Sequence, residues 1–144
     1  MAVSDQVARL QRRLEAIPER VREAVQPSLV QSAEELAGMM RQLAPDDPAT
    51  DAPDLKSSIA VTPPGQSTPP YSQPGGSKVA GELEALVTVG NDAVRYPHLL
   101  EYGTSKMEAQ PFFWPAVRLL QTRIKRRTKR AIRKAVRDNW GNGA

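Results

Sequence analysis

The sequence predicts an α+β fold in which a short antiparallel sheet packs against a long N-terminal helix and a long, basic C-terminal helix. Three observations predict this fold: helical spacing of apolar residues near both ends of the chain, alternating apolar residues between them, and turn-forming residues at the junctions. Helices that flank a run of strands typically cover the apolar face of the sheet. A chain of 144 residues fits a single domain spanning residues 1–144.

The N-terminal part, residues 1–43, is predicted to be helical. Ser4 is a suitable N-cap, and the apolar residues after it recur at steps of three and four: Val7, Leu10, Leu14, Ile17, Val21, Val25, Leu29, Ala33, Leu36 and Met40. Pro18 and Pro27 interrupt this pattern. Because proline removes a backbone donor and clashes with the preceding turn, we expect a kink, or a split into two helices near Gln26.

The middle of the chain, residues 55–104, is predicted to form the sheet. A proline- and aspartate-rich turn at 44–53 precedes it, and residues 55–61 and 81–90 are the strand candidates. Between the strands, residues 62–78 contain five prolines and three glycines. Because loops of this length are usually functional or disordered, we expect a mobile, extended loop.

The C-terminal part, residues 111–140, is predicted to be a helix roughly 40 Å long. Pro111 and Pro115 bracket its start, and Gly141 is the expected C-terminal cap. Its apolar stripe is narrow and consists of Phe113, Val117, Leu120, Ile124, Thr128, Ala131 and Ala135.

Charge is distributed unequally along the chain. Residues 109–144 hold ten basic residues and one acid, a net charge of +9, whereas residues 1–108 hold ten basic and fifteen acidic residues, a net charge of −5. A dipolar subunit of this kind could bind nucleic acid through its basic end, or bind copies of itself with acid against base. Aromatic residues make up only 5% of the chain, which predicts a thin core completed by neighbouring subunits.

The basic residues of the C-terminal helix leave two interpretations open. They could contact nucleic-acid phosphates, or they could be solvated or paired with acidic protein surface, for example with Glu15, Glu19, Glu23, Glu34 and Glu35. Aromatic residues are not interleaved with the basic ones, which argues against a base-stacking platform. The candidate residues facing DNA or an acidic partner are Arg123, Arg126, Arg127, Arg130, Arg133, Lys134 and Arg137.

Sequence motifs of enzymes are missing. The chain has no cysteine and a single histidine, His98, and it contains no GxSxG, GxxxxGK[ST] or HExxH motif. We therefore expect no catalytic residues, no metal and no cofactor. The N-terminus has no apolar signal-peptide core, and no apolar run is long enough for a membrane span, so we expect no membrane partner.

The segment from Tyr96 to Ala116 is the most distinctive. It contains three consecutive aromatic residues, Phe112, Phe113 and Trp114, between two prolines. The simplest interpretation is a turn followed by a helix start whose aromatics fill the core. However, three successive helical side chains cannot all face one core, so at least one should be exposed, where aromatic residues mark interfaces.

The string HLLEYGTSKMEAQPFFWPAV in this segment resembles the signature of the small tail-component family of HK-type and lambda-type siphophages. The matching positions are Glu101, Tyr102, Gly103, Thr104, Ala109, Pro111, Phe112, Pro115 and Ala116. Upstream, the resemblance continues at Ala44, Pro45, Leu55, Ser58 and Ile59, and it covers roughly residues 33–125. Pro53 and Asp54 depart from the Thr-Gly that the family usually has there, and the loop at 62–78 is unusually rich in proline.

This resemblance implies a non-enzymatic virion protein of the phage neck, assembled in the host cytoplasm. It would complete or terminate the tail and join it to the head connector as part of a ring, with a hexamer the first expectation and a dodecamer the second. Its partners would be copies of itself and neighbouring neck and tail-tube proteins, with non-specific contact to genomic DNA in the channel. The expected interface residues are Glu101, Tyr102, Gly103, Thr104, Pro111, Phe112, Phe113, Trp114 and Pro115.

Overall fold

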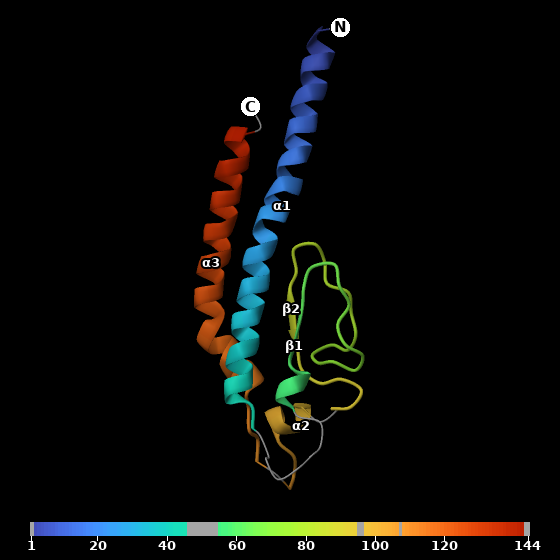
Figure 1. Ribbon diagram of the computed structural model, residues 1–144, viewed down its shortest axis with the longest axis vertical. Helices are drawn as coiled ribbons and strands as arrows, with labels where there is room; N and C mark the ends of the chain where they lie inside the picture. The colour runs from blue at the N-terminus through green and yellow to red at the C-terminus, as the bar shows by residue number, and fades with distance from the viewer. Residues whose placement is uncertain (1, 46–54, 95–96, 107, 143–144) are drawn as a thin grey trace.

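Two long helices stand side by side, and a small β-hairpin region packs against the lower part of the first (Figure 1). The structure is a computed structural model that describes residues 2–45, 55–94, 97–106 and 108–142. The elements in chain order are α1 (Ala2–Leu43), the 3₁₀ helix η1 (Lys56–Ser58), β1 (Ala60–Thr62), β2 (Leu86–Thr88), α2 (Pro97–Tyr102) and α3 (Phe113–Asn142). This architecture confirms the predicted α+β fold class.

Helix α1 is continuous through both Pro18 and Pro27, so of the two alternatives predicted near Gln26, a kink or a split, the split is wrong and the kink stays a prediction. A proline within a helix is unfavourable by about 3 kcal/mol, because one backbone hydrogen bond is lost. Packing on the C-terminal side of Pro27 offsets this loss: Ala33, Ala37 and Met40 are buried there. The prolines therefore weaken the helix locally without ending it.

Helices α1 and α3 run in opposite directions along most of the length of α3 (Figure 1). Small residues allow their close approach, since Ala33 and Ala37 of α1 and Ala116 and Ala135 of α3 are all buried. Helix α3 extends through Asn142, so Gly141 lies in its last turn and does not cap it as predicted.

The sheet consists of two antiparallel strands of three residues each, with Val61 opposite Val87 at its centre. Both strands are shorter than predicted. In the predicted strand 55–61, residues Lys56–Ser58 form the 3₁₀ helix η1 instead. There the Ser58 hydroxyl donates a 2.6 Å hydrogen bond to the Leu55 carbonyl oxygen. A serine side chain that binds nearby backbone in this way competes with a strand ladder.

The proline-rich segment 62–78 is folded back on itself instead of being extended as predicted. Backbone hydrogen bonds join Gly65 N to Ala80 O at 3.0 Å and Thr68 N to Lys78 O at 2.8 Å. Further along, Gln73 and Val89 exchange two backbone hydrogen bonds of 2.8 and 3.0 Å, so the segment returns to the end of β2. The β-hairpin therefore carries a folded extension held by its own backbone.

A sharp turn after β2 leads the chain towards α2. The Asn91 side-chain oxygen accepts hydrogen bonds from Ala93 N and Val94 N, both at 2.9 Å. Gly90 has a φ of +89°, and a Cβ there would lie 2.9 Å from the Val94 carbonyl oxygen. Glycine is therefore required at position 90 both for its backbone conformation and for lack of space.

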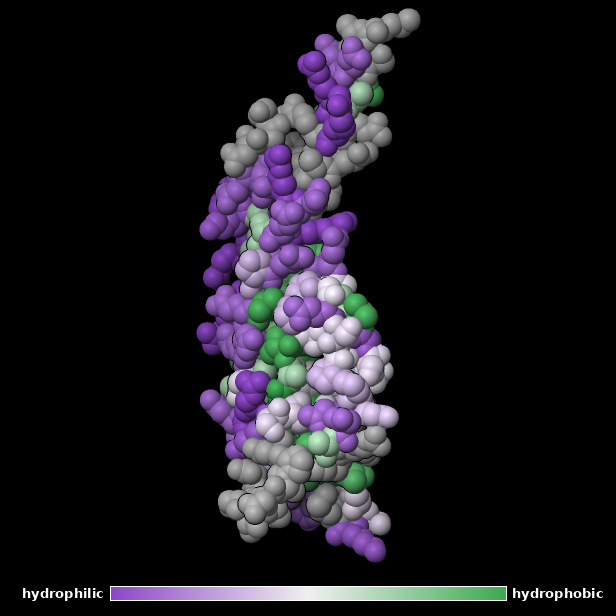
Figure 2. Space-filling view, turned by 45° about the vertical axis from the view of Figure 1, so that its right-hand side comes forward, coloured by the Kyte–Doolittle hydropathy of each residue, from purple (hydrophilic) through white to green (hydrophobic). Residues whose placement is uncertain are grey.

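The core lies at the lower end of the molecule, where the end of α1, η1, the sheet and the start of α3 meet (Figure 1). Phe112, Met40 and Val94 are its largest fully buried apolar side chains. The complete buried cluster is Ala37, Met40, Ala44, Leu55, Ile59, Val89, Val94, Phe112, Phe113 and Ala116. Figure 2 shows other apolar side chains at the surface of the same lower half, while the described surface of the upper half is mostly hydrophilic.

Candidate interaction site

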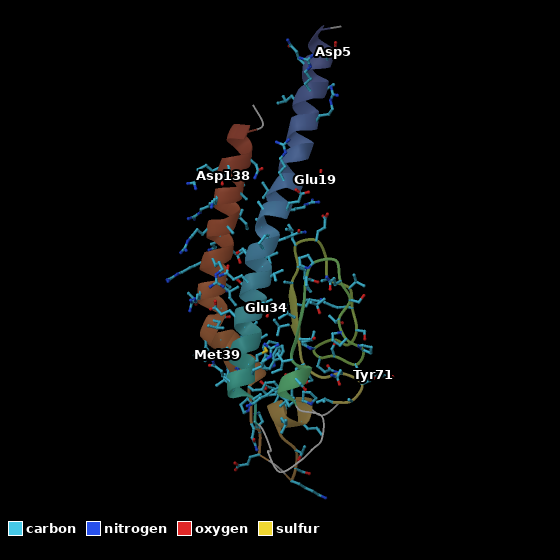
Figure 3. The ribbon with its side chains drawn as sticks, viewed as in Figure 1. Asp5, Glu19, Glu34, Met39, Tyr71 and Asp138 are labelled. Carbon is cyan, nitrogen blue, oxygen red and sulfur yellow. The ribbon has the colours of Figure 1, made fainter. Side chains whose placement is uncertain are left out.

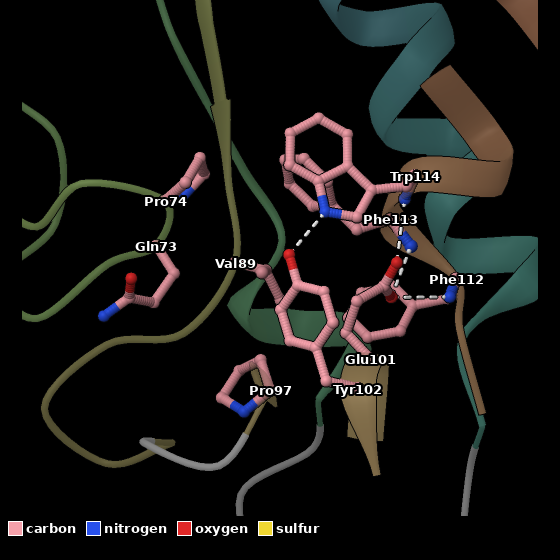
Figure 4. A pocket seen from close by; sticks show the side chains of 9 residues that line it. All are labelled: Gln73, Pro74, Val89, Pro97, Glu101, Tyr102, Phe112, Phe113 and Trp114. Atoms are coloured by element: carbon pink, nitrogen blue, oxygen red, sulfur yellow. Dashed lines mark hydrogen bonds between the residues drawn. The ribbon is translucent and has the colours of Figure 1, made fainter. Parts of the chain in front are cut away.

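The carboxylate of Glu101, on α2, closes the N-terminus of α3. Its Oε2 accepts hydrogen bonds from Phe112 N at 2.8 Å and Phe113 N at 3.0 Å, and its Oε1 accepts one from Trp114 N at 3.0 Å (Figure 4). Only 8% of Glu101 is exposed. The first backbone N–H groups of a helix have no hydrogen-bond partner within the helix. The helix dipole is also positive at this end, so a negative charge is favoured there. Glu101 therefore fixes where α3 begins.

Residues around Glu101 hold α2 in position for this contact. Gly103 follows the last residue of α2 with a φ of +75°, and its N–H bonds to the Leu99 carbonyl oxygen at 2.9 Å, an ordinary glycine helix ending. The Thr104 hydroxyl accepts a 3.2 Å hydrogen bond from Lys106 N. Glu101, Gly103 and Thr104, three of the predicted interface residues, thus have contacts within the chain itself.

The three consecutive aromatic residues divide between core and surface. Phe112 is fully buried and Phe113 is 8% exposed, whereas Trp114 is 41% exposed. The prediction that at least one of them faces outward is therefore confirmed. The Phe113 and Trp114 rings meet edge to face, with centroids 4.9 Å apart and an angle of 74° between planes. Of the flanking prolines, Pro111 is exposed and Pro115 is half-buried.

Tyr102 and Trp114 form an exposed aromatic pair. The Trp114 Nε1–H donates a 2.9 Å hydrogen bond to the Tyr102 hydroxyl, and Tyr102 is 70% exposed (Figure 4). Beside them is a mainly apolar hollow of about 110 Å³, which Val89 and Pro97 also line together with Gln73 and Pro74 from the proline-rich segment. The pair, Tyr102 and Trp114, is called the aromatic pair below. It joins two amphipathic rings at the surface, the residue types that favour protein interfaces.

The seven basic candidates on α3 separate into two groups. Arg127 and Arg123 both pair with Glu35 of α1. The Arg127 Nη2 lies 2.6 Å from Glu35 Oε2, and the Arg123 Nε lies 3.2 Å from Glu35 Oε1. Arg127 also donates a 3.2 Å hydrogen bond to the Ser32 hydroxyl. For these two arginines, pairing with acidic protein surface is the interpretation that the structure supports. The other five candidates are exposed: Arg126, Arg130, Arg133, Lys134 and Arg137.

Several basic side chains of α3 project to the side away from α1. Figure 3 shows long side chains with nitrogen ends projecting from α3 away from α1. Arg137 lies 3.9 Å from Asp138, the single acid of this helix. Leu119, which is 64% exposed, lines a groove at the edge of this surface with Arg123, Arg126, Arg127 and Arg130. The outer side of α3 is therefore a strongly positive surface.

Two features of this site were missed from the sequence. Helix α2 was not predicted, because six residues are too few to show a helical repeat; Pro97 occupies the first position of the helix, where proline is favoured. The capping role of Glu101 was also missed. The sequence does contain a signal for this role: Glu101 is an acid that follows an apolar pair and lies a short distance before the predicted start of the helix at 111.

The described residues show neither a metal-binding cluster nor a helix that could span a membrane. Across residues 2–45, 55–94, 97–106 and 108–142, no group of three or more His, Cys, Asp and Glu side chains is arranged to hold a metal ion. Within these ranges, no helix combines the length and apolar character needed to cross a membrane. His98 belongs to α2, and its side chain lies outside the described part of the structure. Residues 46–53 of the turn predicted at 44–53 also lie outside it.

The fold and the site define a small α+β protein with an exposed aromatic pair and a basic helix face. Comparison with family models gives one match, over residues 8–103, to the family described as Bacteriophage HK97-gp10, a proposed tail component. Because the match covers well over half of the chain, this protein belongs to the HK97-gp10-like family of phage tail components. No curated protein and no solved structure matches the chain significantly.

The family match confirms the resemblance seen in the sequence and also limits it. It begins within α1 and includes Glu101, Tyr102 and Gly103, but it ends before Thr104 and the whole of α3. The aromatic residues Phe112 to Trp114 and the basic helix therefore lie outside the matched region.

Proposed function

We propose that this chain is a structural protein of the phage virion, located at the head-tail interface, where it completes or terminates the tail and joins it to the head connector. The observation that carries the proposal is membership of a tail-component family together with an exposed aromatic pair. The role is architectural, with no catalytic step. The subunit is assembled in the host cytoplasm and acts in an oligomeric ring, a hexamer in our first expectation and a dodecamer in our second.

The aromatic pair is the contact point that we assign to a neighbouring neck or tail-tube protein. Tyr102 and Trp114 present apolar rings with polar tips, and exposed aromatics of this kind carry much of the binding energy of protein interfaces. Pro111 is exposed just before α3 and can extend the same surface. The half-buried Gly103 and the buried Glu101, Phe112 and Phe113 would act by holding this surface in place.

Replacing Trp114 by alanine is expected to block head-tail joining without unfolding the subunit. Trp114 is 41% exposed, so its loss removes partner contacts while the fully buried Phe112 stays in place. Electron microscopy of lysates should show separate full heads and tails. Leu119→Ala is the control, because Leu119 is an exposed apolar residue on another side of α3 and its loss should leave joining normal. Full infectivity of the Trp114→Ala phage would contradict the proposal.

Contact with DNA through α3 is the second candidate function, and the five exposed basic residues of this helix favour it. Filter binding to duplex DNA over a salt series is the measurement. The test variant combines Arg126→Gln, Arg130→Gln and Arg133→Gln. If these arginines neutralise phosphates, the slope of log affinity against log salt should become shallower by about 0.9 for each phosphate contact that is lost. Arg9→Gln on α1 is the control. Binding that is undetectable at physiological salt would exclude this candidate.

A further inference from the structure

Helices α1 and α3 carry exposed charges of opposite sign at the same spacing. Glu23 and Glu34 of α1 are exposed and lie 11 residues apart. Arg126 and Arg137 of α3 are also exposed and also lie 11 residues apart. This separation is about three turns of a helix, or about 16 Å, so the two members of each set point in nearly the same direction. Within the described part of the chain, Glu23, Glu34 and Arg126 form no ion pair, and Arg137 has only a 3.9 Å contact with Asp138.

These charges are turned away from the contact between the two helices. Glu35 and Arg127 mark that contact, because they pair with each other across it at 2.6 Å. Glu34 comes one residue before Glu35, and Arg126 comes one residue before Arg127. Successive residues of a helix point about 100° apart, so Glu34 and Arg126 each lie well to the side of the contact. Both are therefore open to another molecule.

The pairing inside the chain also fixes which residues lie at the same height. Glu35 bonds to two arginines one turn apart on α3, so it is level with the turn between them. The helices run in opposite directions, so each step back along α1 corresponds to a step forward along α3 (Figure 1). Glu34 is therefore level with Arg126, and Glu23 is level with Arg137. The single chain holds two acids and two arginines at matching heights without joining them.

We propose that α3 of one copy of this chain lies antiparallel beside α1 of a second copy, with Arg126 paired to Glu34 and Arg137 paired to Glu23. Between its two acids, α1 contains no charged residue that could repel α3 of the second copy. The planar guanidinium group of arginine can bind a carboxylate through two parallel hydrogen bonds. A second copy is favoured because the spacing and the heights of the two sets of charges match on this one chain.

This contact rests on the proposed function in one respect, since it would join neighbouring subunits of the proposed ring. Surfaces matched at equal heights require no shift along the helix axis from one subunit to the next, which is the condition for a ring to close. A single exposed ion pair contributes little to affinity. In a closed ring, however, each subunit makes the contact on two sides, so weak contacts act together.

Charge reversal followed by mixing tests the contact. The acid-reversed protein carries Glu23→Arg and Glu34→Arg, and the base-reversed protein carries Arg126→Glu and Arg137→Glu. Sedimentation velocity of the full-length wild type at low salt should show oligomers. Each reversed protein alone brings like charges together, so its self-association should weaken at least about tenfold. An equal mixture restores opposite charges at every contact, so oligomers should return.

Recovery on mixing excludes misfolding as the cause of the loss, because both proteins must be folded to assemble together. Arg9→Glu combined with Arg12→Glu is the matched control: both residues are exposed near the start of α1, and the change in net charge equals that of the base-reversed protein. This control should associate like the wild type.

Three results would overturn the contact: a wild type that stays a single subunit, reversed proteins that associate as the wild type does, or a mixture that does not recover. A single-subunit wild type whose DNA binding is lost in the base-reversed protein would assign the arginines to DNA instead. The neck role is tested separately, because Trp114→Ala leaves all four charges in place. Failure of the mixing test together with unjoined Trp114→Ala particles would remove the contact and keep the neck role.

Discussion

Replacing Phe112 by alanine should lower the free energy of unfolding by about 3–5 kcal/mol, the range for truncating a buried phenylalanine. Phe112 is the largest fully buried side chain and belongs to the core cluster. It also lies immediately before α3, so the cavity would open where α1, the sheet and α3 meet. Because domains of this size are stable by only about 5–15 kcal/mol, this change would remove a large fraction of the total stability. Chemical denaturation followed by circular dichroism measures the change.

Two further variants make this prediction specific. Phe112→Leu keeps most of the buried volume and should lower the free energy of unfolding by less than half as much as alanine does. Trp114→Ala removes a larger ring two residues later, but from a position that is 41% exposed, and should have a smaller effect than Phe112→Ala. A Phe112→Ala protein as stable as the Trp114→Ala protein would show that the lower core is not the main source of stability.

Replacing Glu101 by alanine should lower the free energy of unfolding by about 2–4 kcal/mol, because several buried N–H groups lose their acceptor together. The three groups are the backbone N–H groups of Phe112, Phe113 and Trp114, all of which bond to this one carboxylate. The favourable interaction of the charge with the helix dipole is lost as well. The first turn of α3 should then fray, which hydrogen exchange at these three amides can detect.

The controls for Glu101 separate charge from shape. Glu101→Gln keeps one side-chain oxygen as an acceptor, so its loss of stability should be smaller than that of alanine. Glu108→Ala removes an acid that is exposed and should change stability by no more than about 0.5 kcal/mol. If Glu101→Ala and Glu108→Ala proved equally stable, the carboxylate would not be the group that fixes the start of α3.

The helices were the part of the fold that the sequence predicted best. Apolar residues at steps of three and four identified α1 and α3, because a helix must bury one continuous face to be stable. Local rules failed where tertiary contacts decided the outcome. Pro27 does not split α1, since residues after it are buried against other elements. No rule based on neighbouring residues alone can include that contribution.

The strands and the proline-rich segment were predicted less well. Alternation at 81–90 suggested a long strand, yet only Leu86–Thr88 pairs with β1. The partner strand is short because Ser58 closes a turn and also accepts the Gly90 N–H at 3.1 Å. Pairing length therefore depends on a contact between residues 58 and 90, which the sequence pattern does not reveal.

The site was predicted in part. The exposure of one aromatic among Phe112, Phe113 and Trp114 follows from helix geometry, since successive residues point about 100° apart. Which one is exposed depends on how Glu101 orients the first turn of α3, and this requires the structure. The pairing of Arg123 and Arg127 with Glu35 likewise depends on the register between α1 and α3.

The hydrogen bond between Tyr102 and Trp114 has a consequence for any protein that contacts them. Each ring restricts the rotation of the other, and both are attached to backbone that Glu101 holds at the junction of α2 and α3. Side chains already confined to one rotamer lose less conformational entropy when a second protein covers them. The aromatic pair is therefore already ordered in the free subunit, so that part of the loss of side-chain entropy takes place during folding and not during association.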